Sequence, residues 1–383
     1  MATGGNWKEM FHASENGDLE LVRYHLRMGI DPNYQHPEYM TAALIESIRK
    51  GHIEIAQLLL DNGANPKIIK YSGVETPMSV AVSSKNKAAI YLLNTYLSIE
   101  DQNKTVGRRN KILITGGDRG IGKATAKNLL LEGQKVVITV RNEVEGQAIV
   151  EELKEATKNP AISMIQGHLS DIQSCTALIH RIKEKHSDIN VLINNADTWM
   201  MEKMLNADGL EKSFMVNYIA PYLLSKQLFP ILKQNGPARI INRSDRWYTK
   251  GKVDVHKIAY GLGFGRLRTY ANSKQCNALF TIDFAEEIEG SGVTINAMYP
   301  GSINTNLETS SKLISNIAKT IQRFSKPPSY GALALTWLAI NEELEGINGQ
   351  YFNEKRPMEF IKKVKEQSLR TALRVKTEAI INK

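Results

Sequence analysis

A tyrosine and a lysine at helical spacing are the side chains in this sequence that most directly suggest chemistry. Tyr270 and Lys274 stand at positions i and i+4, so on a helix they would share one face. A nearby ammonium favours tyrosinate and is expected to lower the pKa of the phenol. A tyrosine tuned in this way can give or take a proton at a carbonyl or alcohol oxygen. The spacing is common by chance, so the pair needs support from the rest of the chain.

A glycine-rich segment between Lys111 and Arg141 supplies that support. Its pattern of apolar run, glycines, helical periodicity and second apolar run predicts a strand–turn–helix–strand unit. Gly116 would let the chain reverse, Gly120 would let the backbone approach a pyrophosphate, and Gly122 would let the helix pack close to the strand. The helix start would offer N–H groups to phosphates. The segment therefore predicts a dinucleotide site, with an ordinary tight turn as the alternative.

These motifs resemble the short-chain dehydrogenase/reductase family over about residues 110–355. The glycine spacing G-x-x-x-G-x-G and the Tyr-x-x-x-Lys pair both fit its pattern. Several segments are similar to the retinol-dehydrogenase-like branch, notably Ala207-Asp208-Gly209 and the run from Leu344 to Phe352. The further matching positions are Asn194-Asn195-Ala196, Asn217, and Pro300-Gly301 with Thr305.

The resemblance implies roles for individual residues. Tyr270 would be the general acid in carbonyl reduction, Lys274 would hold the cofactor ribose, and Asn217 would hold a proton-relay water. The nicotinamide would supply the hydride chemistry, and no metal is expected. Ser244 is a further catalytic candidate. The cofactor contacts would be Gly116, Asp118, Arg119, Gly120, Ile121, Gly122, Arg141, Asn195, Ala196, Tyr270, Lys274, Pro300, Gly301 and Thr305.

The end of the second strand predicts the type of cofactor. In this fold an acid there would bind the ribose 2′-hydroxyl, whereas an arginine accepts a 2′-phosphate. Arg141 ends the strand without a neighbouring acid, and Arg119 adds a second positive charge in the glycine loop. The sequence therefore favours NADP(H) over NAD(H); the alternative is that Arg141 is an ordinary surface residue.

Three positions depart from the family pattern. Asp245 stands where the catalytic serine is expected, Asp197 replaces the glycine of Asn-Asn-Ala-Gly, and His168 replaces an adenine-contacting acid. A carboxylate at 245 could accept a hydrogen bond from Tyr270, would oppose tyrosinate formation, and could donate to a substrate only when protonated. Ser244 would substitute if the strand end shifted by one residue. A catalytically impaired scaffold or interaction protein therefore stays open beside the enzyme.

The elements that must position these residues alternate between strands and helices. This alternation predicts a doubly wound parallel Rossmann sheet of about seven strands, with ligands at the carboxyl ends of the strands. Apolar residues on the expected mouth of the site suit a hydrophobic carbonyl or alcohol substrate, although loop packing explains them about as well: Trp199, Met200, Met201, Met204, Trp247 and Tyr248. The segment 302–325 would be the substrate lid by family analogy.

The first hundred residues repeat with a period near 34. Residues 16–22 align with 50–56, and Gly51 aligns with Asn86 at a spacing of 35. The segment Leu59–Pro66 and the Thr76-Pro77 opening resemble ankyrin repeats, which bind proteins on a concave face. The third copy is degraded. An all-α ankyrin module for a protein partner is expected, and a structural appendage that stabilises its neighbour is the alternative.

The expected organisation is therefore an ankyrin domain at 1–97, a linker at 98–110, a Rossmann domain at 111–355 and a basic C-terminal helix at 356–383. The final helix would pack on the core or bind a membrane surface peripherally. The sequence leaves a homodimer open.

Composition sets the remaining bounds. The 383 residues are 42% apolar and 23% charged, with a net charge of +9. The two cysteines fit a reducing compartment rather than a disulfide framework. Without a leader pattern or a membrane-spanning run, we expect a cytoplasmic protein. The basic excess lacks a nucleic-acid motif, so no nucleic-acid partner is expected.

Overall fold

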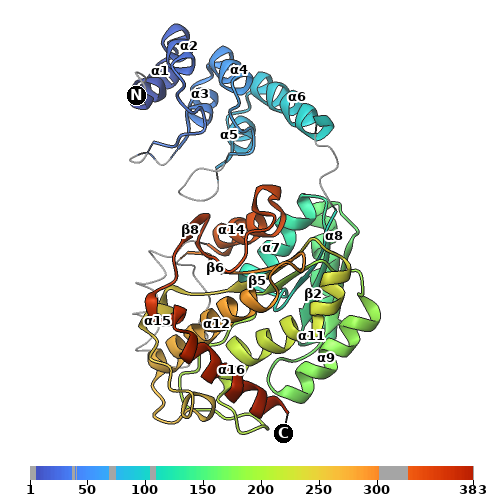
Figure 1. Ribbon diagram of the computed structural model, residues 1–383. Coiled ribbons are helices and arrows are strands. Elements are labelled where there is room, and N and C mark those ends of the chain that lie inside the picture. The colour runs from blue at the N-terminus through green and yellow to red at the C-terminus, as the bar shows by residue number, and fades with distance from the viewer. Residues whose placement is uncertain are drawn as a thin grey trace. The chain divides into compact units, whose positions relative to one another are not determined.

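The computed structural model describes residues 6–36, 39, 41–68, 75–103, 109–301 and 327–382, with the backbone alone over 97–103. The chain divides into two compact units, Met1–Arg108 and Arg109–Lys383, which are described separately below (Figure 1).

The described part of the first unit is built from helices that follow one another in antiparallel pairs. The pairs are α1 Trp7–Asn16 with α2 Leu19–Arg27, α3 Ala43–Lys50 with α4 Ile53–Asp61, and α5 Pro77–Ser83 with α6 Lys87–Asn103. Buried aliphatic residues such as Leu44, Ile48, Leu59 and Leu93 form one continuous core between them. The expected all-α ankyrin architecture is confirmed. Because α6 continues to Asn103, the segment 98–103 that was predicted as linker is helical.

Left-handed residues explain the sequence repeat. Gly17 and Gly51 follow the first helix of their pairs with φ of 87° and 83°, a conformation that glycine adopts without steric cost. In the third copy Lys85 takes this place with φ of 53°. The following residues make the same backbone bond, from Asn86 N to Ala81 O as from His52 N to Ser47 O. Gly51 therefore corresponds to Lys85 and not to Asn86, and the period stays at 34.

The second unit is organised around an eight-stranded sheet with the order β3-β2-β1-β4-β5-β6-β7-β8. The pairs from β3 to β7 are parallel and β8 is antiparallel to β7. The strands are β1 Lys111–Ile114, β2 Lys135–Val140, β3 Ile162–Gln166, β4 Val191–Asn194, β5 Ala238–Arg243, β6 Val293–Tyr299, β7 Tyr351–Asn353 and β8 Arg356–Met358. The predicted doubly wound sheet is confirmed. The eighth strand was not predicted, because it is three exposed residues long and contains a proline.

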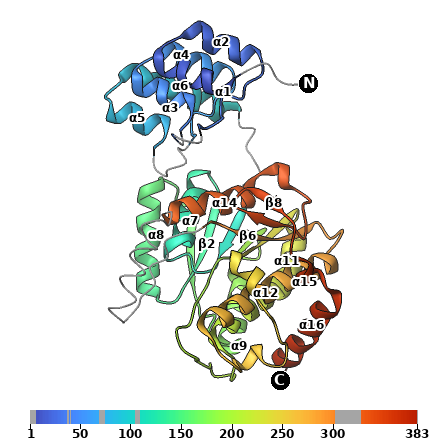
Figure 2. The ribbon, with the colours of Figure 1, turned by 90° about the vertical axis from the view of Figure 1, so that its left-hand side faces the viewer.

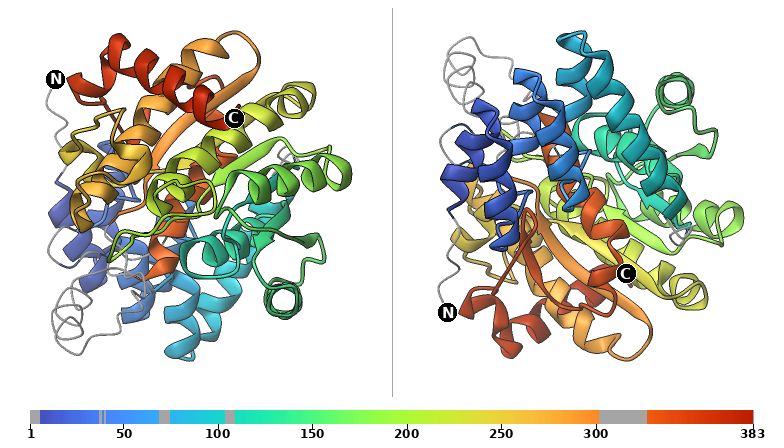
Figure 3. Two further views of the ribbon diagram at one scale, coloured as in Figure 1. Left: turned by 90° about the horizontal axis from the view of Figure 1, so that it is seen from below. Right: turned by 90° about the horizontal axis from the view of Figure 1, so that it is seen from above.

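Helices cover both faces of this sheet (Figures 2 and 3). One core cluster joins the sheet to α7 Gly120–Leu131, α8 Glu143–Thr157 and α14 Pro328–Ile340. The other joins it to α9 Ile172–Lys185, α11 Ala220–Gln234 and α12 Arg266–Glu287. The strand order reverses between β1 and β4, so the carboxyl ends of these strands mark the place where a ligand is expected.

The helix predicted from Leu210 to Lys233 is interrupted. It consists of α10 Lys212–Phe214, a π-helical turn over Met215–Ile219, and then α11. Such turns often occur at functional sites, and this one carries Asn217.

The C-terminal segment packs on the core of the second unit. After α15 Lys362–Lys365, α16 Gln367–Ile381 buries Leu373, Thr377 and Ile380. Thr377 Oγ1 lies 2.7 Å from Tyr218 Oη, and Arg374 pairs with Asp283 of α12 at 3.2 Å. The apolar face of α16 is therefore covered by protein, as the packed-helix alternative expected. Among the described residues, no helix combines the length and apolar character needed to cross a bilayer.

Candidate functional site

The glycine turn after β1 is tightly packed. Gly116 has φ of 62°, and a Cβ on Gly122 would lie 2.2 Å from the Gly116 carbonyl oxygen. The Asn195 side chain donates from Nδ2 to the carbonyls of Thr115 and Gly116, at 2.9 and 3.2 Å. The segment that follows β4 therefore braces the turn, and Ala196 lies directly against Gly116.

Gly120 begins α7 in a different environment. It has φ of 53°, and a Cβ added there would meet nothing within 4 Å. Its neighbour Arg119 caps the helix without a side-chain hydrogen bond. An open glycine at an uncapped helix start fits an approaching phosphate. Of the other predicted contacts here, Asp118 pairs with Arg119 at 3.4 Å, and the Ile121 side chain is buried in the core, so only its backbone could serve a ligand.

We predict that Gly120→Ala markedly weakens the binding of a nicotinamide dinucleotide, assayed with NADPH, while the free energy of unfolding falls only slightly. The left-handed conformation should lower the free energy of unfolding of the alanine variant by about 1 kcal/mol. The added methyl group would also occupy the space that is open to a ligand. Calorimetric titration and urea unfolding measure the two effects. Gly122→Ala is the contrasting variant, because its Cβ meets backbone and should damage both; equal NADPH affinity in Gly120→Ala and the parent would contradict the prediction.

The ends of β2 and β3 present exposed polar residues. Arg141 is exposed, and its carbonyl accepts a bond from Gln166 Nε2 at 3.3 Å. His168, after β3, is also exposed. The structure thus places the Arg141 side chain in solvent, available to an anionic ligand.

The reactive pair lies on α12, as predicted, but its partners are two carboxylates. Tyr270 and Lys274 are 8% and 1% exposed. The Tyr270 hydroxyl donates to Asp197 Oδ2 at 3.1 Å and to Asp245 Oδ2 at 3.3 Å. Lys274 Nζ lies 2.9 Å from Asp197 Oδ1 and donates to the carbonyl of Arg243 at 3.3 Å. In this structure the ammonium is therefore held by Asp197.

Arg243 completes the arrangement. Its Nη2 lies 3.6 Å from Asp197 Oδ2, and its Nη1 donates to the Asn195 carbonyl at 3.2 Å. We call Asp197, Arg243, Asp245, Tyr270 and Lys274 the charge cluster. Two cations face two carboxylates, so the cluster can be neutral overall. Arg243 was not identified from the sequence as a site residue. Its position at the end of a central strand, two residues before Asp245, could have indicated it.

The cluster reverses the expected behaviour of the tyrosine. Burial, followed by the charges of Asp197 and Asp245, raises the pKa of Tyr270 well above its ordinary value. The expectation of a lowered pKa for this phenol is wrong, because burial and the two carboxylates outweigh the opposing effect of Arg243. Tyr270 is therefore a neutral hydrogen-bond donor.

The two carboxylates differ from each other. Burial acts to raise the pKa of Asp197, but Lys274 and Arg243 outweigh it and the pKa is lowered. Burial raises the pKa of Asp245, and the Asp197 charge adds to this effect against the opposing Trp247 N–H and Lys274. Burial also lowers the pKa of Lys274, despite the attraction of Asp197. Asp245 is thus the member of the pair that protonates more readily.

Ser244 does not take the place of the missing serine. It is buried and stays in register with β6, where its N–H donates to the Met298 carbonyl at 2.7 Å. The strand end is therefore not shifted, and Asp245 is the residue that reaches Tyr270. The Ser244 hydroxyl has no hydrogen-bond partner among the described residues.

Asn217 ties the surrounding elements together. Its Nδ2 donates to the Thr198 carbonyl at 2.8 Å and to Ser273 Oγ at 3.0 Å, and its Oδ1 accepts from Thr198 N at 2.8 Å. The π-helical turn thereby joins the segment after β4 to α12, next to Tyr270.

The predicted apolar mouth is only partly present. The Trp199 ring lies 5.7 Å from the Tyr270 ring, and its Nε1 donates to the Arg266 carbonyl. Tyr248 instead packs in the core, 4.9 Å from Tyr351. Pro300 and Gly301 follow β6; the glycine has a φ of 94°, and a Cβ added there would meet the side chain of Glu354. Thr305 and the predicted lid lie outside the described residues.

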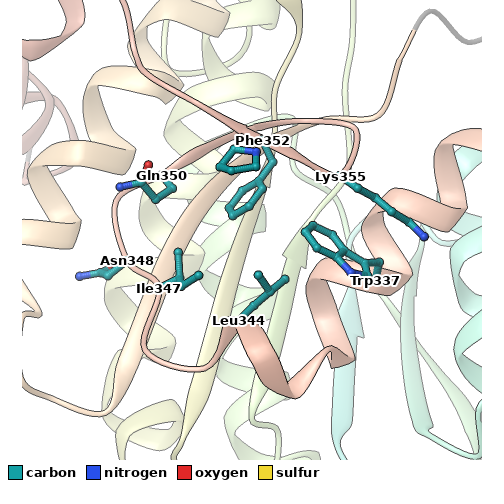
Figure 4. A pocket seen from close by; sticks show the side chains of 8 residues that line it. Trp337, Leu344, Ile347, Asn348, Gln350, Phe352 and Lys355 are labelled. Atoms are coloured by element: carbon teal, nitrogen blue, oxygen red, sulfur yellow. The ribbon is translucent and has the colours of Figure 1, made fainter. Parts of the chain in front are cut away.

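A separate hollow of about 480 Å³ opens at β7, β8 and the end of α14 (Figure 4). Trp337, Leu344, Ile347 and Phe352 give it an apolar lining, and Lys355 stands at its side. None of its lining residues belongs to the charge cluster or the glycine turn, so it is not part of the candidate site.

Comparison with known proteins identifies the family that this geometry represents. A family model described as short chain dehydrogenase matches residues 110–313, and one described as ankyrin repeats (3 copies) matches 10–103. The chain belongs to the short-chain dehydrogenase family.

Curated members of the short-chain dehydrogenase family include similar proteins named as retinol dehydrogenases. Retinol dehydrogenase 12 of Mus musculus is 32% identical and covers 64% of this chain and 78% of its own length. Retinol dehydrogenase 14 of Homo sapiens is 30% identical and covers 67% and 82%. The chain is thus a short-chain dehydrogenase-type oxidoreductase related to retinol dehydrogenases, with ankyrin repeats.

Solved structures show the same fold. An uncharacterized protein from Mycobacterium paratuberculosis aligns with a TM-score of 0.57 at 20% identity, covering 72% of this chain and 94% of that one. A blue fluorescent protein from a metagenomic library, in complex with NADPH, aligns with a TM-score of 0.51 at 22% identity, covering 64% and 95%.

Proposed function

We propose that this protein is an NADP(H)-dependent oxidoreductase that interconverts a carbonyl and an alcohol on an apolar substrate. One observation carries the proposal: the segment Asn195–Asp197 runs from contact with the glycine turn to contact with Tyr270 and Lys274. Three consecutive residues thus connect the glycine turn, where we propose that the dinucleotide binds, to the buried proton donor Tyr270. The open Gly120 and the exposed Arg141 support an NADP(H) cofactor.

The protein's own residues would position the cofactor and the substrate, and would protonate the substrate oxygen. The nicotinamide cofactor, when bound, would supply the hydride chemistry. Tyr270 holds its proton because its pKa is raised well above its ordinary value. The protonated form can donate to an oxygen that gains charge during reduction, whereas alcohol oxidation needs a base.

Support for an apolar substrate comes from Trp199, whose ring borders Tyr270. The names of the retinol dehydrogenase relatives point the same way. We propose that the ankyrin repeats bind a protein partner, and that the protein is cytoplasmic, which its two free and buried cysteines support.

A second candidate is a catalytically impaired protein that uses its ankyrin repeats for binding. The ion pair between Lys274 and Asp197 favours this candidate, because it engages the lysine that the enzyme would use. The carboxylate of Asp245 beside Tyr270 favours it too.

Calorimetric titration with NADPH and NADH tests the cofactor proposal without a guess at the substrate. We expect micromolar or tighter NADPH binding and weaker NADH binding. Arg141→Ala should weaken NADPH binding roughly tenfold, the value of a charge-assisted hydrogen bond, and leave NADH unchanged. Arg356→Ala, an exposed arginine on β8, is the matched control. If neither nucleotide binds the parent, the second candidate replaces the first.

A further inference from the structure

Asp197 lies on the chain segment that joins the glycine turn to the reactive pair. The residue before it, Ala196, has its Cα 3.3 Å from the position of a Cβ on Gly116. The Asn195 side chain donates hydrogen bonds to the Thr115 and Gly116 carbonyls at the start of the glycine turn. One residue further, the Asp197 carboxylate reaches α12. Along this segment, the Asp197 carboxylate therefore lies between the proposed dinucleotide site at the glycine turn and the Tyr270–Lys274 pair.

This carboxylate engages both donors of the pair. Lys274 Nζ approaches one of its oxygens at 2.9 Å and the Tyr270 hydroxyl donates to the other at 3.1 Å. Arg243 Nη2 adds a third contact, and a second positive charge, at 3.6 Å from Asp197 Oδ2. Lys274 is 1% exposed, and its Nζ already contacts Asp197 and the Arg243 carbonyl, so only one of its three N–H groups is left for a further partner.

We propose that Asp197 competes with a bound dinucleotide for Lys274 and thereby limits the affinity for the whole cofactor. The inference rests on the proposed function, since it requires a dinucleotide at the glycine turn. A ribose hydroxyl that binds Lys274 has to share the ammonium with Asp197 or displace its carboxylate. A bond between two ions is stronger than one between an ion and a neutral hydroxyl, so this exchange costs binding free energy. The cost falls on the nicotinamide ribose and not on the adenosine half.

A general charge effect would give a different pattern. Removing any nearby negative charge favours an anionic ligand through longer-range electrostatics. Adenosine 2′,5′-bisphosphate carries the adenine and two phosphates but no nicotinamide ribose. Comparing it with NADPH therefore separates competition for Lys274 from simple attraction.

The test is calorimetric titration of the full chain with NADPH and with adenosine 2′,5′-bisphosphate. Asp197→Asn is expected to tighten NADPH binding roughly tenfold or more, the value of one charged hydrogen bond, and to leave the bisphosphate unchanged. Asp188→Asn is the matched control, because Asp188 is also paired with a lysine, Lys111, but at the opposite ends of the strands. It should change neither ligand.

A double variant shows whether the gain passes through the lysine. In a Lys274→Met background, Asp197→Asn should produce no gain in NADPH affinity. Circular dichroism checks folding, and Asp197→Gly, the family's usual residue, replaces Asp197→Asn if that variant does not fold.

Three results would overturn the inference. Unchanged NADPH affinity in Asp197→Asn, with the bisphosphate still bound, would show that Asp197 does not compete. Equal tightening of both ligands would show a general charge effect. Binding of neither ligand by any variant would overturn the proposed function along with the inference.

Discussion

Asp245→Ser is expected to raise carbonyl reduction about a hundredfold in kcat/KM at pH 7, the scale of one lost hydrogen-bond donor at a reacting oxygen. The serine hydroxyl can donate to a substrate oxygen, whereas an ionised Asp245 only accepts. Consumption of NADPH with a panel of apolar aldehydes and ketones, followed by absorbance, measures the rate. Asp245→Ala is the control, since it removes the charge without adding a donor, and should gain less.

The pH dependence provides a second readout. The pKa of Asp245 is raised by burial, so its protonated, donating form persists to higher pH than that of an exposed aspartate. Parent activity should therefore rise as the pH falls, while that of Asp245→Ser should lack this rise. A parent with no activity at any pH, beside an active Asp245→Ser, would show that the native protein is the impaired scaffold.

Lys274→Met is expected to lower the free energy of unfolding of the second unit by about 3–5 kcal/mol, the cost of breaking a buried ion pair from one side. The lysine is 1% exposed and pairs with Asp197, so its loss leaves Arg243 alone to balance two carboxylates. Urea unfolding followed by tryptophan fluorescence measures this, because Trp199, Trp247 and Trp337 all belong to the second unit.

Lys226→Met is the matched control for this stability prediction. Lys226 also pairs with a carboxylate, Glu287, at 2.6 Å, but it is 27% exposed. Such partly exposed pairs contribute about 1 kcal/mol or less. Equal losses in the two variants would show that the charge cluster is no more important to stability than a surface pair.

The sequence predicted the elements whose signals are local. Glycine spacing and apolar runs identified the β1–α7–β2 unit, and alternation of patterns predicted the parallel sheet. The π-helical turn at Asn217 was missed, because one extra residue in a turn barely alters the apolar periodicity. The third repeat was aligned one residue too far along, with Gly51 opposite Asn86. The left-handed position is occupied by Lys85, and a lysine there does not show in the sequence as the equivalent of a glycine.

The site was harder to predict than the fold. Helical spacing placed Tyr270 and Lys274 on one face, but it carries no information on burial or on residues from other strands. Asp197 and Asp245 were each interpreted as an isolated departure from a pattern. Their joint contact with Tyr270, and the contact of Arg243 with Asp197, depend on the ends of β4 and β5 meeting helix α12 in space.

The bond between Tyr218 and Thr377 joins residues 159 positions apart in the chain. Contacts of such long range close a large loop, so they tend to form late in folding, after local helices and strand pairs. We therefore expect α16 to dock on the π-helical turn and α12 at a late stage of folding. Interactions absent from the folding transition state act mainly on the rate of unfolding. The docking of α16 is therefore expected to set how long a folded molecule survives, with little influence on how fast it folds.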